Sequence, residues 1–110
     1  LLRAQKIQKR AARTGFDWPD KSGPEAKIAE ELVELDEAES DDDRFEEMGD
    51  LLFATVNLSR HRGIDAELAL KAASQKFEKR FRLMEEMAGE KFVDLNLDEK
   101  EELWRRAKKV

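Results

Sequence analysis

The sequence has no cysteine, no long apolar run and no excess of positive charge. Without cysteine the chain can form neither a disulfide framework nor a thiolate nucleophile or metal site. No segment approaches the ~20 apolar residues of a membrane span, and no signal-peptide pattern is present, so we expect a soluble, cytoplasmic protein. The net charge of -5 disfavours a general nucleic-acid surface, because binding of the phosphate backbone draws on clustered lysine and arginine.

Charged residues make up 43% of the chain and hydrophobic residues only 40%. At 110 residues the chain is long enough for one domain, residues 1–110, but this apolar supply is thin for a monomer. We therefore expect a homodimer that completes its core with a second copy. The first residues, Leu1-Leu2-Arg3, lack a starting methionine, and we expect one domain of a longer chain.

Period-two alternation is missing beyond a few residues, so the sequence predicts an all-α protein. The fold we expect resembles a four-helix bundle with a short C-terminal helix. Glycine, proline and capping residues predict where each helix begins and ends. The four main helices cover Leu1 to about Thr14, Pro24 to about Glu39, a start near Ser40 to Arg62, and Asp65 to about Ala88. After an irregular stretch from Lys91 to Leu97, Asp98 and Glu101 resemble a capping box for a last helix through Trp104.

Two acidic pairs lie on successive predicted helices with the same spacing of three residues. Residues three apart are neighbours on a helix surface, so Glu31 with Glu34, and Glu47 with Asp50, can each converge on one ion. Carboxylates from two facing helices form a hard-ligand cage suited to Mg²⁺ or Mn²⁺, which substrate phosphates commonly complete. The pattern thus indicates a divalent-metal site and a triphosphate substrate.

Helical geometry places some of these acids next to apolar surface. Glu31 lies roughly 60° from the stripe formed by Ile28, Leu32 and Leu35, and Asp50 opens an almost wholly apolar run. Partly buried carboxylates are costly without a cation partner, which favours metal binding. The spacing is equally compatible with a second interpretation without a metal, in which these acids form a solvated face and complement a helix dipole.

Other polar and aromatic residues are candidates for binding a substrate. Lys76 and Arg80, one helical turn apart, can meet phosphate oxygens, and Lys27 lies one turn before Glu31. Each can instead be an ordinary surface ion pair or solubilising charge. Asn57 can bind a base, a sugar or a water molecule held by the metal, or be a satisfied core amide. Trp18 and Trp104 are candidates for stacking on a nucleobase, or plain core residues.

The acidic pattern resembles the signature of the MazG family of nucleoside triphosphate pyrophosphohydrolases. Glu31-x-x-Glu34 is followed after twelve residues by Glu47-x-x-Asp50. Beyond the acids, the similarity includes Ala4-Gln5-Lys6-Ile7-Gln8-Lys9-Arg10, Gly15-Phe16-Asp17-Trp18, residues 46–58 from Glu46 to Leu58, and Lys76-Phe77-Glu78-Lys79-Arg80-Phe81. These segments look like the C-terminal domain of tandem MazG proteins, and the resemblance is weakest over residues 40–45 and 89–97.

The resemblance implies Mg²⁺-dependent hydrolysis of the α–β phosphoanhydride of an NTP or dNTP, which gives a nucleoside monophosphate and pyrophosphate. It also implies a role in nucleotide-pool housekeeping and a homodimer. By position, Glu31, Glu34, Glu47 and Asp50 would be metal ligands. Glu30 would be a further ligand or a base that orients water. The implied substrate contacts are Lys27, Glu46, Lys76, Arg80, Trp104 and Lys108.

Two other interpretations stay open at this point. The same helical scaffold serves narrower substrates, such as dUTP, dCTP or phosphoribosyl-ATP. The chain could also be a non-catalytic dimerisation or regulatory domain, although the presence of every acid of the pattern argues against this.

Overall fold

The computed structural model describes all residues, 1–110, and contains helices without any strand, which confirms the predicted all-α class. The helices are α1 (Leu2–Arg13), α2 (Ser22–Glu37), α3 (Asp41–His61), α4 (Ala66–Ala88), the 3₁₀ helix η1 (Gly89–Asp94) and α5 (Leu97–Lys108). None of them is both long and apolar enough to cross a membrane. The chain forms two compact units, Leu1–Ala69 and Leu70–Val110.

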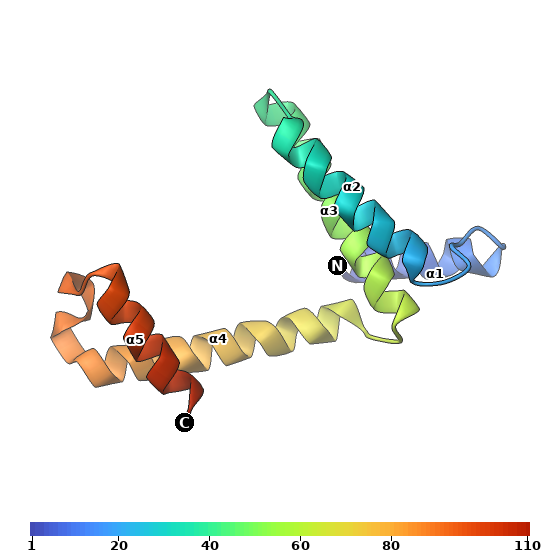
Figure 1. Ribbon diagram of the computed structural model, residues 1–110. Helices are drawn as coiled ribbons and strands as arrows, with labels where there is room; N and C mark the ends of the chain where they lie inside the picture. Colours follow the sequence, from blue (N-terminus) through green and yellow to red (C-terminus); the bar gives the residue numbers. More distant parts are fainter. The chain divides into compact units, whose positions relative to one another are not determined.

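An antiparallel hairpin of α2 and α3 is the centre of the first unit (Figure 1). Ala38 is extended (φ -65°, ψ 132°) and ends α2, and Ser40 begins α3 by accepting a 3.1 Å hydrogen bond from the Asp43 backbone N–H. Three aspartates occupy the first turn of α3, where the helix dipole favours negative charge. The cap and the extended residue before it fix a tight reversal that brings the two helices side by side.

Buried glutamines hold α1 against the rest of the first unit. Gln8 donates from Nε2 to the Phe53 carbonyl at 2.9 Å, and Gln5 accepts from the Ala66 N–H through Oε1, also at 2.9 Å. Both side chains are buried, and the apolar core between the helices is small, with Ala54, Val56 and Ala66. Polar contacts therefore supply much of the specificity with which α1 docks on α3 and on the start of α4.

In the second unit, α5 folds back along α4 (Figure 1). Met84 packs with Leu103 and Ala107, and the Trp104 ring lies 5.4 Å from the Phe77 ring. The segment after Ala88 is the 3₁₀ helix η1, so the expectation of an irregular stretch over Lys91–Leu97 was wrong up to Asp94.

Three predicted helix ends need correction. The cap of the last helix is Asn96 with Glu99, not Asp98 with Glu101, because the Asn96 side chain accepts from the Glu99 N–H at 2.8 Å and Glu99 bonds back to the Asn96 N–H. That helix also continues past Trp104 to Lys108. The second helix begins at Ser22, two residues before Pro24. Asp20 accepts from the Ser22 backbone N–H at 2.8 Å and so starts the helix earlier.

Candidate functional site

The hairpin of α2 and α3 brings the predicted acids together. Carboxylate oxygens of Glu31, Glu47 and Asp50 lie within 4.8 Å of one another, and so do oxygens of Glu30, Glu31 and Glu34. Glu31 belongs to both groups. The i, i+3 spacing on each helix and the pairing of the two helices thus form one acidic cluster, which we define as Glu30, Glu31, Glu34, Glu47 and Asp50.

Glu31 is the most buried acid of the cluster, with 1% of its surface exposed. Its Oε1 pairs with Lys27 Nζ at 3.0 Å, one helical turn earlier, while Oε2 is buried without a hydrogen-bond partner. Glu47 Oε2 is also buried and unpartnered. Burying two carboxylate oxygens without a hydrogen-bond donor or a cation costs free energy, and Lys27 alone does not compensate for it.

The close approach of the carboxyl groups perturbs the titration of the cluster. Hydrogen bonds to Glu31 and Glu34, together with burial, raise the pKa of Glu47 to about 7. The hydrogen bond from Lys27 is the main cause of a lowered pKa at Glu31. A hydrogen bond from Glu47 lowers the pKa of Glu34, but burial and the charges of Glu31 and Glu30 outweigh it, so the net shift is upward. The cluster therefore retains a proton near neutral pH when no cation is bound.

The residues of the acidic cluster fit a hard divalent cation. All candidate ligands are carboxylates, the donor type that Mg²⁺ and Mn²⁺ prefer, and the unpartnered oxygens of Glu31 and Glu47 are donors that the protein itself leaves unused. A cation would satisfy both oxygens and replace the proton held by Glu47.

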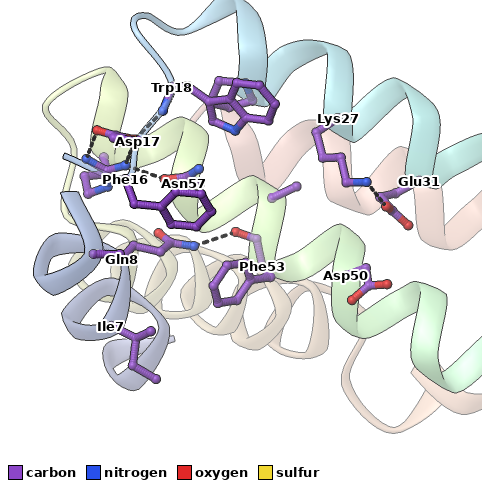
Figure 2. A pocket seen from close by; sticks show the side chains of 14 residues that line it. Ile7, Gln8, Phe16, Asp17, Trp18, Lys27, Glu31, Asp50, Phe53 and Asn57 are labelled. Atoms are coloured by element: carbon purple, nitrogen blue, oxygen red, sulfur yellow. Dashed lines mark hydrogen bonds and ion pairs between the residues drawn. The ribbon is translucent and has the colours of Figure 1, made fainter. Parts of the chain in front are cut away.

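A pocket of about 600 Å³ runs from the acidic cluster toward the loop between α1 and α2. Figure 2 shows Lys27, Glu31 and Asp50 at one end of it, and Phe16, Trp18 and Asn57 toward the other. The first end is charged and the second largely aromatic. A ligand that is flat and apolar at one end and carries an anionic group together with a cation at the other matches this division.

Trp18 lies directly over Gly23 at the start of α2. A Cβ atom at Gly23 would fall 2.5 Å from Trp18 Cδ2, so the close approach requires glycine. Trp18 is 47% exposed and faces the pocket, which leaves part of the indole available to a ligand.

Not every predicted site residue belongs to this group. Glu46 is exposed on α3 and outside both groups of converging carboxylates. Other predicted substrate contacts lie in the second unit, where the Arg80 guanidinium sits 5.4 Å from the centre of the Trp104 ring. These contacts are Lys76, Arg80, Trp104 and Lys108. Their part in substrate binding stays a prediction.

Sequence reasoning did not propose several of the residues that line the pocket as site residues, among them Gln8, Phe16, Asp17 and Arg60. Asp17 forms a bidentate ion pair with Arg60, and the Arg60 guanidinium lowers the pKa of Asp17 well below its usual range. Because the two residues are 43 positions apart, only the resemblance at Gly15-Phe16-Asp17-Trp18 marked this loop as notable. Gln8 was marked only by the resemblance at Ala4-Gln5-Lys6-Ile7-Gln8-Lys9-Arg10, since a glutamine on a basic helix is otherwise ordinary.

Comparison with known proteins adds independent observations. The MazG nucleotide pyrophosphohydrolase domain matches residues 25–85, which include the whole acidic cluster. The chain is 46% identical over 121 aligned residues to the nucleoside triphosphate pyrophosphohydrolase of Escherichia coli (strain K12), covering 99% of this chain and 44% of that protein. It is 45% identical over 111 residues to the nucleoside triphosphate pyrophosphohydrolase/pyrophosphatase MazG of Thermotoga maritima, covering 98% and 44%.

A third relative is the uncharacterized protein YabN of Bacillus subtilis (strain 168), 42% identical over 67 residues, with 58% of this chain and 14% of that protein covered. The chain thus spans less than half the length of the curated relatives it matches. The domain match extends over more than half of the chain and includes both acidic pairs at their expected spacing, and on this basis the chain belongs to the MazG nucleotide pyrophosphohydrolase domain family.

Proposed function

We propose that this domain hydrolyses the α–β phosphoanhydride of nucleoside triphosphates, NTP or dNTP, to a nucleoside monophosphate and pyrophosphate with the help of Mg²⁺. The observation that carries the proposal is Glu31: a carboxylate 1% exposed, shared by two groups of converging acids, with one oxygen left unpartnered at the charged end of a pocket. The names of the relatives in E. coli and T. maritima agree with this reaction.

Glu31, Glu34, Glu47 and Asp50 would hold the cation, with Mn²⁺ as a possible substitute for Mg²⁺. When bound there, the cation would neutralise the negative charge that builds on the phosphate oxygens during anhydride cleavage. The carboxylates of the cluster could not by themselves accommodate a triphosphate, since like charges would repel it.

The protein's own residues would then perform the remaining tasks. Glu30 is exposed beside the cluster and can accept a proton from water as water adds across the α–β bond. Lys27 extends from α2 to the same cluster and can move its ammonium group from Glu31 to a phosphate oxygen. We further propose Lys76 and Arg80 as contacts for the triphosphate and the released pyrophosphate, and Trp104 with Lys108 as a pair that contacts the nucleotide.

A second copy of the chain is the proposed partner. Large apolar side chains on the hairpin remain about half exposed: Leu32 at 49%, Val33 at 54% and Leu52 at 52%. Side chains of this kind in one region mark a surface suited to burial against another protein. A homodimer would cover them and supply the apolar core that the composition lacks.

The test is an assay of pyrophosphate release from all eight common NTPs and dNTPs, with and without Mg²⁺. We expect Mg²⁺-dependent release, lost in Glu47→Gln and Asp50→Asn while far-ultraviolet circular dichroism stays helical. Asp42→Asn on the same helix is the matched control, because Asp42 is exposed and outside the cluster. Wild-type rates in either cluster variant would contradict the assignment.

A further inference from the structure

A tether joins the loop between α1 and α2 to the end of α3. Asp17 accepts from Arg60 through both oxygens, Oδ2 from Nη1 at 2.9 Å and Oδ1 from Nη2 at 2.5 Å. His61 Nε2 lies 2.9 Å from the same Oδ1. The three side chains are mostly shielded from water, at 24%, 16% and 9% exposed for Asp17, Arg60 and His61. A bidentate pair in such surroundings fixes orientation as well as position.

The same arginine fixes the orientation of a pocket residue. Arg60 Nη2 donates to Asn57 Oδ1 at 2.7 Å. A guanidinium has only donors, so the Asn57 atom that faces it must be the oxygen. The Asn57 amide nitrogen is therefore turned away from Arg60. It has no hydrogen-bond partner in the protein and is not among the buried unpartnered atoms, so a ligand in the pocket can reach it.

We propose that Asp17 and Arg60 are positioning residues that hold Asn57 with its amide nitrogen toward the pocket, where it donates a hydrogen bond to the nucleoside part of the substrate. The inference rests on the proposed function. It makes Asn57 a donor, so the ligand atom it meets is an acceptor, such as a carbonyl or ring nitrogen of the base or a sugar oxygen.

Two observations favour the nucleoside over the triphosphate as the partner of Asn57. First, Asn57 lies seven residues from Asp50 on α3, a separation of about 10 Å along the helix axis, and Phe16 and Trp18 are near it in Figure 2. Second, Asp17 neutralises Arg60 and uses both of its terminal nitrogens, so this end of the pocket offers no free cation to a phosphate.

The experiment compares a nucleotide with an anion that lacks base and sugar. For each variant we would measure the KM and kcat for the best NTP of the panel, and the inhibition constant of inorganic tripolyphosphate. Asn57→Asp keeps the oxygen that Arg60 needs but removes the donor. Arg60→Lys keeps the positive charge but loses the two guanidinium nitrogens that bind both oxygens of Asp17. Arg62→Lys is the matched control, since Arg62 also ends α3 and pairs with Glu25 at 2.9 Å outside the pocket.

Loss of one neutral hydrogen bond corresponds to about a three- to tenfold rise in KM. We expect this rise in Asn57→Asp and Arg60→Lys, with a much smaller change in kcat, an unchanged tripolyphosphate inhibition constant, and no change in Arg62→Lys. A purely structural tether would leave Asn57→Asp like wild type, because its contact with Arg60 survives. That result, or an equal loss of tripolyphosphate binding in these variants, would overturn the proposal.

A second measurement does not need turnover. In ¹⁵N spectra, the Asn57 side-chain amide signal, assigned by its absence in Asn57→Asp, should shift when a non-hydrolysable α,β-methylene NTP is added, and not with tripolyphosphate. If the wild-type protein shows this shift but does not hydrolyse nucleotides, the proposed function is wrong and the role of Asn57 stands. If the protein hydrolyses nucleotides but the Asn57 signal does not shift, the role of Asn57 is wrong and the proposed function stands.

Discussion

Binding of Mg²⁺ should release a proton from the acidic cluster in an amount that depends on pH. The pKa of Glu47 is raised to about 7 without a cation, because the neighbouring Glu31 and Glu34 carboxyl groups, together with burial, favour its protonated form. A carboxyl group with this pKa is about nine-tenths protonated at pH 6, about half at pH 7 and about one-tenth at pH 8. Because a cation binds the deprotonated carboxylate, these fractions are the protons expected to leave per site.

Isothermal titration calorimetry measures this number directly. Mg²⁺ is titrated into nucleotide-free protein in two buffers of equal pH and different ionisation enthalpy, and the dependence of the observed heat on buffer gives the protons released. We expect about 0.9 at pH 6, falling to about 0.1 at pH 8. Asp42→Asn should behave like wild type. Release near zero at pH 6, or equally large at pH 8, would refute the raised pKa of Glu47.

The same shift makes the metal-free protein less stable as pH rises. Since the folded pKa of Glu47 lies above its usual 4.5, the folded state holds more protons than the unfolded state between these values. The resulting stabilisation is complete below about pH 4.5 and is lost as pH rises through about 7. Glu47→Gln, which cannot ionise, should therefore melt at a higher temperature than wild type at pH 8 in chelator, and added Mg²⁺ should narrow the difference.

Three further predictions concern the packing of Trp18, the N-terminal cap of α3 and the proposed dimer surface. Gly23→Ala should displace Trp18, since its Cβ would lie 2.5 Å from the indole, with a change in tryptophan fluorescence and about 1–3 kcal/mol lost from the free energy of unfolding in urea. Ser40→Ala removes the acceptor of the 3.1 Å bond from Asp43 and should cost about 1 kcal/mol in the same measurement. Leu52→Glu places a charge on the proposed dimer surface and should shift light-scattering mass toward that of a monomer; an unchanged mass would remove Leu52 from the interface.

Local signals in the sequence were enough to predict the helices and the acidic cluster. Gly15 and Gly63 adopt positive φ just past the ends of α1 and α3, as expected for helix stops. The spacing of three residues placed each acidic pair on one face, and the hairpin then brought the pairs together. These features depend on neighbours in sequence, which is why the pattern of residues was sufficient.

Contacts between distant segments could not be predicted in this way. The predicted cap of the last helix, Asp98 with Glu101, was wrong, because the extended backbone of Asn96 directs the Asn96 side chain at the Glu99 N–H. The pair of Asp17 and Arg60 joins residues with no shared periodicity, and the buried contact of Gln8 with the Phe53 carbonyl is invisible without the packing of α1 on α3. Such contacts decide how the loop and the pocket are built, so the sequence predicted the charged end better than the aromatic one.

Helix α3 sets the distance between the two ends of the pocket. Asp50 faces the acidic cluster, buried Ala54 lines the pocket one turn later, and Asn57 follows after nearly one more turn. Since a helix rises 1.5 Å per residue, this spacing is fixed by the backbone and not by a flexible loop. The small side chain of Ala54 leaves room between the ends. This rigid separation suits the proposed triphosphate substrate, whose reacting phosphates must lie at one set distance from the nucleoside. The loop held by Asp17 lines the aromatic end.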